Sequence, residues 1–236
     1  MIVLSKKRIV FIISVLVISF GFIVINGNVY GESSSIIVDD ESIGYTVILD
    51  AGHGQPDGGA ENDDGISEEE INLKIVLKLQ GLLEQTGYTV ILTRSDENGI
   101  YDLDSSTLKS KKISDLKNRV ELANNEEADI FVSIHLNKIE QSEYYGWQTF
   151  YQEENEQSKS LAESIQNNLN YAIQKENKRE ILSLTGKYIM DNVKIPTVTV
   201  ECGFLSNAEE AAKLVTDQYQ EELAWGIYTG IIEYFE

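Results

Sequence analysis

Two apolar, β-branched runs in this chain break off at polar residues, and its only two histidines lie at those points. The run at residues 45–50 precedes His53, and the run at residues 130–134 leads into His135. Short apolar runs of this kind are typical of buried strands. Because open α/β sheets bind ligands at the carboxyl ends of their strands, we interpret the two imidazoles as parts of one site rather than as isolated core histidines.

A helix is predicted directly after the glycine-rich loop at residues 51–66. Ser67 and Glu70 match a capping box, in which the glutamate side chain reaches back to the start of the helix. This arrangement leaves Glu68 in the first turn facing the loop, and it directs Glu69 to solvent.

Strands and helices continue to alternate along the chain. Apolar runs predict strands at 88–93, 147–151 and 197–201, the last of which ends in a carboxylate. Periodic apolar residues predict a short helix around Leu116 and longer helices around Leu161 and Leu223, and Ser206 with Glu209 gives a second capping box. We therefore expect a single three-layer α/β domain, with a twisted, mostly parallel sheet of about five or six strands flanked by helices.

The first 31 residues have the pattern of an export signal. Three basic residues, at positions 6–8, precede an apolar stretch at 9–25, and Gly31 is a small residue at a candidate cleavage point. We expect a signal peptide or an amino-terminal membrane anchor at 1–31, a spacer at 32–44 and the folded domain at 45–236. The domain is thus expected to work outside the cytoplasm.

The chain is strongly acidic, with a formal net charge of −20. Without the leader, 16 basic residues face 39 acidic ones, which gives −23. Nucleic acid and anionic lipid are poor partners for such a surface, so membrane contact is expected only through an uncleaved leader. The one basic cluster consists of four lysines, Lys109, Lys111, Lys112 and Lys117. We interpret it as part of a solvated loop or as a docking site for an anionic glycan or a partner.

Four motifs occur at residues 47–54 (VILDAGHG), 65–73 (GISEEEINL), 133–137 (SIHLN) and 200–207 (VECGFLSN). Together they resemble the motifs of the zinc-dependent N-acetylmuramoyl-L-alanine amidases of bacterial cell walls. Each motif alone is weakly specific, but the four occur in the family's order and spacing. The resemblance covers the chain from about residue 45 to its end.

The resemblance implies that His53, Glu68 and His135 bind one zinc ion and that Glu201 is the catalytic carboxylate. A zinc-bound hydroxide would attack the substrate carbonyl, with Glu201 acting first as general base and then as general acid. Family members usually carry Glu-Lys where this chain has three consecutive glutamates, so Glu70 is the alternative third ligand.

Three further polar residues each keep two interpretations. Arg119 binds a substrate carboxylate or pairs with an acid on its own helix. Asn137 positions the loop after His135 or forms an ordinary turn. Asp50 orients a ligand histidine or forms a local turn with its own backbone.

The implied activity is hydrolysis of the amide between N-acetylmuramic acid and L-alanine of the peptidoglycan stem peptide. The general layout is most similar to the spore-cortex, germination-specific amidases, which implies muramic δ-lactam formation in the forespore intermembrane space. Residues 138–146 leave no room for the inhibitory helix of other members, although a protein activator or targeting partner is still possible. The alternatives are a peptidoglycan-binding module of weak or no activity and a zinc peptidase that cuts within the stem peptide.

Overall fold

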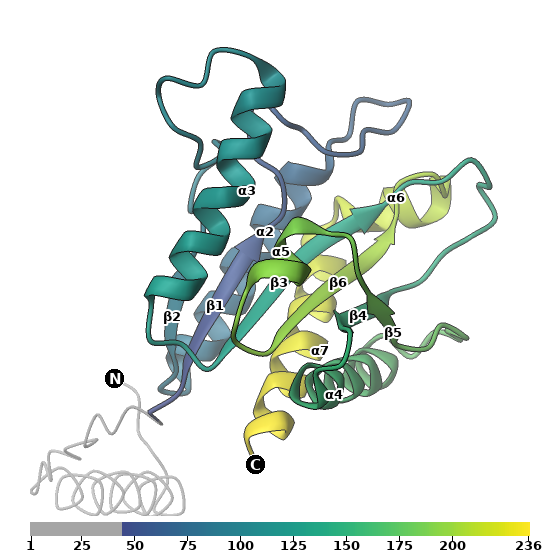
Figure 1. Ribbon diagram of the computed structural model, residues 1–236. Coiled ribbons are helices and arrows are strands. Elements are labelled where there is room, and N and C mark those ends of the chain that lie inside the picture. Colours follow the sequence, from purple (N-terminus) through teal and green to yellow (C-terminus); the bar gives the residue numbers. More distant parts are fainter. Residues whose placement is uncertain (1–43) are drawn as a thin grey trace, which may run out of the picture. The chain divides into compact units, whose positions relative to one another are not determined.

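The computed structural model describes residues 44–236. These residues form three layers, in which one sheet lies between two layers of helices (Figure 1). The six strands are β1 (Thr46–Ala51), β2 (Thr89–Leu92), β3 (Ile130–Asn137), β4 (Gln148–Gln152), β5 (Leu182–Leu184) and β6 (Thr197–Phe204). The helices are α2 (Glu68–Gln85), α3 (Leu108–Asn125), α4 (Glu156–Ile173), α5 (Tyr188–Asn192), α6 (Ala208–Leu214) and α7 (Asp217–Phe235). The predicted leader and residues 32–43 of the predicted spacer lie outside these residues.

The strand order across the sheet is β2-β1-β3-β6-β4-β5. Neighbouring strands are parallel except for β4 and β6, which are antiparallel. The prediction of a mostly parallel sheet of five or six strands is therefore confirmed. The carboxyl ends of the parallel strands β1, β3 and β6 meet at one edge, which is where such sheets bind ligands.

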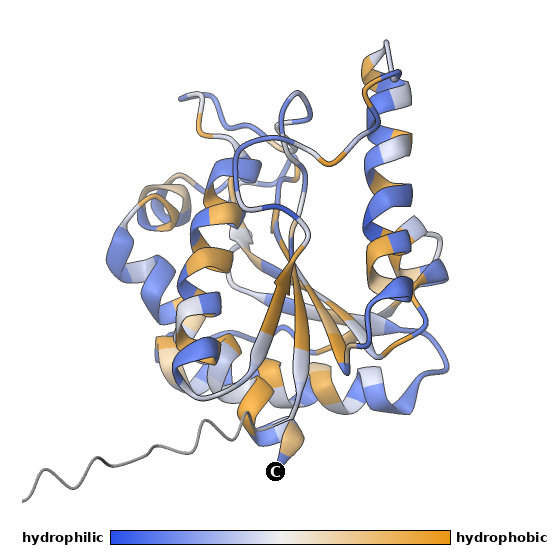
Figure 2. Cartoon of the chain, turned by 90° about the vertical axis from the view of Figure 1, so that its left-hand side faces the viewer, coloured by the Kyte–Doolittle hydropathy of each residue, from blue (hydrophilic) through white to orange (hydrophobic). Residues whose placement is uncertain are grey.

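Helices cover both faces of the sheet, and Figure 2 shows the apolar strands enclosed between them. Helices α2, α4 and α7 pack against one face through a large buried cluster that includes Leu49, Val132 and Val200. On the other face a smaller cluster joins Ile48 and Phe131 to α3 and α5. Apolar side chains on both faces are expected for parallel strands that helices bury on each side. Among residues 44–236, no helix has the length and apolar character needed to cross a membrane.

Helix α2 begins where it was predicted, but the predicted capping box does not form. The side chain of Ser67 makes no capping hydrogen bond, and Glu70 pairs with Lys74 at 2.7 Å on the exposed surface. The glycine-rich loop replaces the box, because the amides of Glu68 and Glu69 donate to carbonyls of that loop at 2.8 and 3.2 Å. The loop thus wraps the start of the helix and satisfies amide groups that would otherwise lack partners.

Helix α3 is longer than the short helix predicted around Leu116. It begins at Leu108, since Thr107 and Ser110 form a reciprocal capping box at its start. The basic cluster therefore lies on a helix, and its interpretation as part of a loop was wrong. In Figure 1 the first turns of α3 extend past the carboxyl edge of the sheet, so this helix reaches over the region where ligands bind.

Two boundaries near the carboxyl end also differ from the prediction. Strand β6 continues to Phe204, so Glu201 lies within the strand rather than at its end. Helix α6 is capped by Asn207, whose side chain accepts from the amide of Glu210, and not by the predicted pair Ser206 and Glu209. An asparagine at this position caps as well as a serine, which explains the shift of one residue.

Candidate metal centre

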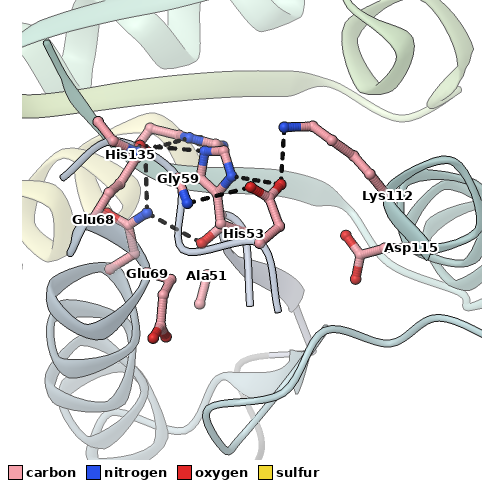
Figure 3. Close-up of polar contacts among 12 residues, drawn as sticks. Ala51, His53, Gly59, Glu68, Glu69, Lys112, Asp115 and His135 are labelled. Carbon is pink, nitrogen blue, oxygen red and sulfur yellow. Dashed lines mark hydrogen bonds and ion pairs between the residues drawn. The ribbon is translucent and has the colours of Figure 1, made fainter. Parts of the chain in front are cut away.

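His53, Glu68 and His135 converge at the carboxyl edge of the sheet (Figure 3). His53 follows β1, His135 lies near the end of β3, and Glu68 is the first residue of α2. One ligand atom from each residue lies within 4.8 Å of the others, and no other such group occurs in the part of the chain that the structure describes. Three separate elements thus bring two imidazoles and one carboxylate to a common point.

Glu68 is the most firmly held residue of the three. Its Oε1 accepts from the Leu136 amide at 3.0 Å and lies 2.9 Å from His135 Nδ1. Its Oε2 accepts from the Ala60 amide at 2.8 Å and lies 3.3 Å from His53 Nε2. Burial would raise the pKa of this carboxyl, but the two histidines outweigh burial and hold the pKa well below its usual range.

His53 is held in an unusual backbone conformation. Its φ of 63° lies in the left-handed region, which non-glycine residues rarely adopt and which is concentrated at functional sites. Its Nδ1 lies 3.1 Å from Asp57 Oδ2, so Nε2 is left to face Glu68. Burial lowers the pKa of His53, but hydrogen bonds to Asp57 and Glu68 more than offset this effect and raise the pKa to about 9.

Two glycines allow His53, Glu68 and His135 to approach one another. A Cβ on Gly52 would lie 2.3 Å from His135 Cε1. A Cβ on Gly59, whose φ is +71°, would lie 2.6 Å from Glu68 Oε2 and 2.7 Å from His53 Cδ2. These distances are far below van der Waals contact, so the site requires glycine, which has no side chain, at both positions.

Two buried arginines anchor the turn that carries His53. Arg119 is 1% exposed, and it donates to the Asp50 carboxylate and to the His53 carbonyl. Arg94 Nε donates to the Ala51 carbonyl at 2.9 Å, and Arg94 Nη2 donates to the Gly52 carbonyl at 3.2 Å. Both guanidinium groups are therefore occupied by backbone that leads into the site.

Asp50 lies beneath this turn and is fully buried. Its carboxylate accepts from Thr93 Oγ1 at 2.7 Å and from Ser133 Oγ at 2.5 Å, in addition to Arg119. Burial raises its pKa, but the Arg119 guanidinium and these hydroxyls outweigh burial, so the net shift is downward. Asp50 forms no hydrogen bond to His53 or His135 within the described residues, and its partners are distant in sequence rather than in a local turn.

Glu201 approaches the cluster from the neighbouring strand. It is the register partner of His135 in the parallel pair β3 and β6, so the two side chains lie on the same face of the sheet. Its Oε2 is buried and has no hydrogen-bond partner among residues 44–236. Burial raises the pKa of Glu201 above its ordinary value of 4.5. Such a carboxylate is poised to exchange a proton.

The remaining predictions had mixed outcomes. Glu70 is exposed and lies apart from the cluster, whereas Glu69 is 5% exposed and accepts from Gln55 at 2.8 Å. The prediction that Glu69 points to solvent was therefore wrong, because the loop and Arg94 fold over it. Asn137 ends β3, and its carbonyl accepts from the Leu205 amide at 2.8 Å, which fastens the two strand ends together.

Sequence reasoning missed Asp57, the hydrogen-bond partner of His53. Asp57 lies in an irregular loop four residues after the histidine, where neither helical nor strand periodicity indicates that two side chains meet. The acidic residue inside the glycine-rich segment was the only available signal, and it resembles any solvated loop residue.

The three residues fit a zinc ion. Zn–N bonds of about 2.0–2.1 Å in tetrahedral geometry place neighbouring donor atoms roughly 3.3 Å apart. The separation of His53 Nε2 from Glu68 Oε2 is 3.3 Å. Asp57 binds the far nitrogen of His53, as carboxylates commonly do behind a ligand histidine.

Comparisons with known proteins identify the family of this chain. The family model described as N-acetylmuramoyl-L-alanine amidase matches residues 47–233. The germination-specific N-acetylmuramoyl-L-alanine amidase of Bacillus subtilis (strain 168) is 35% identical over 192 residues, which cover 81% of this chain and 80% of that protein.

Solved structures give the same result. The CwlD amidase of Clostridioides difficile, solved in complex with the GerS lipoprotein, is 47% identical with a TM-score of 0.79, covering 81% of this chain and 98% of that chain. An N-acetylmuramoyl-L-alanine amidase of Clostridium difficile 630 is 32% identical with a TM-score of 0.71, covering 81% and 96%. This chain therefore belongs to the N-acetylmuramoyl-L-alanine amidase family, in which it is similar to the germination-specific and CwlD amidases.

Proposed function

We propose that this protein is a zinc-dependent hydrolase of the amide between the lactyl carbonyl of N-acetylmuramic acid and the L-alanine of the stem peptide. The observation that carries this proposal is the convergence of His53, Glu68 and His135 beside Glu201, whose Oε2 is buried and unpaired among the described residues. Membership of the amidase family supports the choice of substrate.

The three proposed ligands and Glu201 have separate tasks. His53, Glu68 and His135 would hold a zinc ion, which would supply Lewis acidity to polarise a carbonyl and to lower the pKa of a water molecule toward about 7. Glu201 accepts a proton from the attacking water and returns a proton to the departing nitrogen of L-alanine. The C–N bond breaks, and the products are a lactyl carboxylate on the glycan and a stem peptide with a free amine.

The raised pKa of Glu201 suits both halves of this cycle. A carboxylate that is costly to keep charged accepts a proton more readily, and it then donates that proton to the nitrogen as the C–N bond breaks. Its buried Oε2 has no protein partner among the described residues that would compete with the substrate or with water for this atom.

We further propose a role in the spore cortex, at a site outside the cytoplasm such as the forespore intermembrane space. The similarity to the germination-specific amidase of Bacillus subtilis supports this role. Removal of the stem peptide frees the lactyl carboxyl group that a muramic δ-lactam ring requires. The CwlD structure contains a lipoprotein, which supports a protein partner for this chain as well.

Mass analysis of the products tests the proposed activity. Purified protein loaded with zinc is incubated with muropeptides, and we expect N-acetylmuramic acid without L-alanine together with a stem peptide that begins with L-alanine. A peptidase would leave L-alanine on muramic acid, and a binding module would leave the substrate intact. Either result would contradict the proposal.

A further inference from the structure

A cavity lies next to the proposed metal site. It has a volume of about 300 Å³ and is bordered by the first turns of α3 and by the loops that carry Gly54 and Tyr101. A smaller cavity beside it is lined by His53 and His135. Three residues line both cavities, namely Asp57, Lys112 and Asp115. The two cavities therefore share one wall.

The shared wall consists of side chains that are already paired. Asp57 Oδ2 lies 2.9 Å from Lys112 Nζ and 3.1 Å from His53 Nδ1. Asp115 accepts from Arg119 Nε at 2.7 Å and from the Ile100 amide at 2.7 Å. Figure 3 shows Lys112 and Asp115 on the α3 side of His53. The acidic groups of the wall are thus neutralised from within the protein.

Two further lysines give the larger cavity a positive charge. Lys109 and Lys111 line it, and neither forms an ion pair with any residue of the described range. Lys111 Nζ instead lies over the Tyr101 ring, 4.5 Å from its centroid. In a chain of net charge −20, this pocket is a local site of attraction for an anion.

The cavity also offers apolar surface. Leu108 is 68% exposed at its rim, and Pro56 and Tyr101 contribute to its lining. A pocket with both ammonium groups and apolar walls suits a short peptide that carries a carboxylate. The sugar rings of the glycan carry hydroxyl and acetamido groups without charge, so the lysines favour the peptide side of the substrate.

We propose that this lysine pocket binds the free α-carboxylate of the glutamyl residue of the stem peptide, held by Lys109 and Lys111, while the amide to be cleaved lies beside His53 and His135. The inference rests on the proposed function and extends it to substrate selection. The shared wall places the carboxylate subsite next to the proposed reacting centre.

The test compares two substrates with two forms of the protein. The substrates are N-acetylmuramoyl tripeptides that differ only in whether the α-carboxyl group of the glutamyl residue is free or amidated. For wild type we expect kcat/KM to be on the order of 10-fold higher for the free acid. In the double variant Lys109→Gln with Lys111→Gln, KM for the free acid rises and the preference between the two substrates disappears.

The matched control is Lys194→Gln, which removes one exposed charge next to the start of β6, at the opposite edge of the sheet. It should keep the wild-type preference for the free acid. A double variant that keeps this preference, or a wild type that shows none, would overturn the inference. If the double variant fails to fold, as judged by its melting transition, the single variant Lys109→Gln takes its place and should lose part of the preference.

A binding measurement separates this inference from the proposed activity. The free tripeptide and its amidated form are titrated into zinc-loaded wild type and double variant by calorimetry. Tighter binding of the free acid to wild type alone would support the pocket even if neither substrate were cleaved. Equal binding of the two peptides to wild type would contradict carboxylate binding by the lysine pocket, even if the amidase activity were present.

Discussion

The first turn of α2 and the middle of β6 each present one glutamate to the same site, but the surroundings of Glu68 and Glu201 are opposite. Both oxygens of Glu68 are bonded, to two backbone amides and to two imidazoles. Glu201 Oε2 has no partner in the described part of the chain, and burial raises the pKa of Glu201. A fixed carboxylate with a depressed pKa suits metal ligation, whereas an unpaired one with a raised pKa suits proton transfer.

Replacing Glu68 should have the largest effect. Glu68→Gln removes the anionic ligand and breaks contacts to both histidines, so we expect zinc to be absent from the purified variant and activity to fall below detection. Zinc content by mass spectrometry checks this result. Glu70→Gln, two residues along the same helix and exposed, is the control and should retain both zinc and activity. Metal loss in the control instead of in Glu68→Gln would reverse the ligand assignment.

Replacing Glu201 should affect turnover without affecting the metal. Glu201→Gln preserves the shape of the side chain but removes the proton acceptor, so kcat should fall by roughly 10²- to 10⁴-fold at full zinc occupancy. His135→Ala should lose the metal itself. Equal zinc loss in the two variants would abolish the proposed difference between the glutamates.

Replacing Arg119, which anchors the turn that carries His53, should have a large effect on stability. Arg119→Met leaves the Asp50 carboxylate buried without its countercharge, which should lower the free energy of unfolding by about 3–5 kcal/mol. Lys117→Met, exposed on the same helix, is the control and should change it by less than about 0.5 kcal/mol. Denaturant unfolding measures both.

Acid should narrow the gap between wild type and Arg119→Met. In the wild type the pKa of Asp50 is lowered from 3.8, so its contribution is complete above that value and is lost as the pH falls through the lower, folded pKa. In the variant, burial without the arginine raises this pKa, so protonation relieves the penalty at a higher pH. Unfolding measured at about pH 7 and about pH 4 should show the difference shrinking, and a constant difference would show that the Asp50 charge is not its source.

Weakening the hydrogen bond between Asp57 and His53 should have the smallest effect. Asp57→Asn weakens the hydrogen bond to His53 Nδ1 and the ion pair with Lys112, so zinc affinity should fall by roughly 10- to 100-fold while the fold is kept. Competition with a chromophoric chelator measures the affinity. Asp63→Asn, exposed in the same loop, should leave the affinity unchanged. An equal loss in both variants would mean that the loop charge, rather than the orientation of His53, matters.

The sequence predicted the sheet and the convergence of His53 with His135 because these depend on regular elements, whereas Glu68 was assigned through the resemblance to the amidase family. Hydrophobic periodicity located β1, β3 and β6, and the parallel arrangement then brings their carboxyl ends to one edge. The start of α2 was found at the correct residue but for an incorrect reason, since loop carbonyls rather than a capping box satisfy its first amides. That loop has no periodicity from which its path could be predicted.

The same limitation hid the Asp57 contact and the true start of α3. Asp57 meets His53 only because the irregular loop turns back, and the capping box of α3 uses a serine in place of the usual glutamate. Arg119 kept two interpretations until the fold brought Asp50 and the His53 carbonyl to its guanidinium group. Contacts between distant segments thus decided what local patterns did not.

A crystal structure of the zinc-loaded protein, with anomalous diffraction recorded at the zinc edge, tests the division between the two glutamates most directly. We predict one strong peak about 2.0–2.2 Å from an oxygen of Glu68 and from one ring nitrogen each of His53 and His135, with Glu201 outside bonding distance. A peak bonded to Glu201, or one that shares no centre with the two imidazoles, would contradict the account.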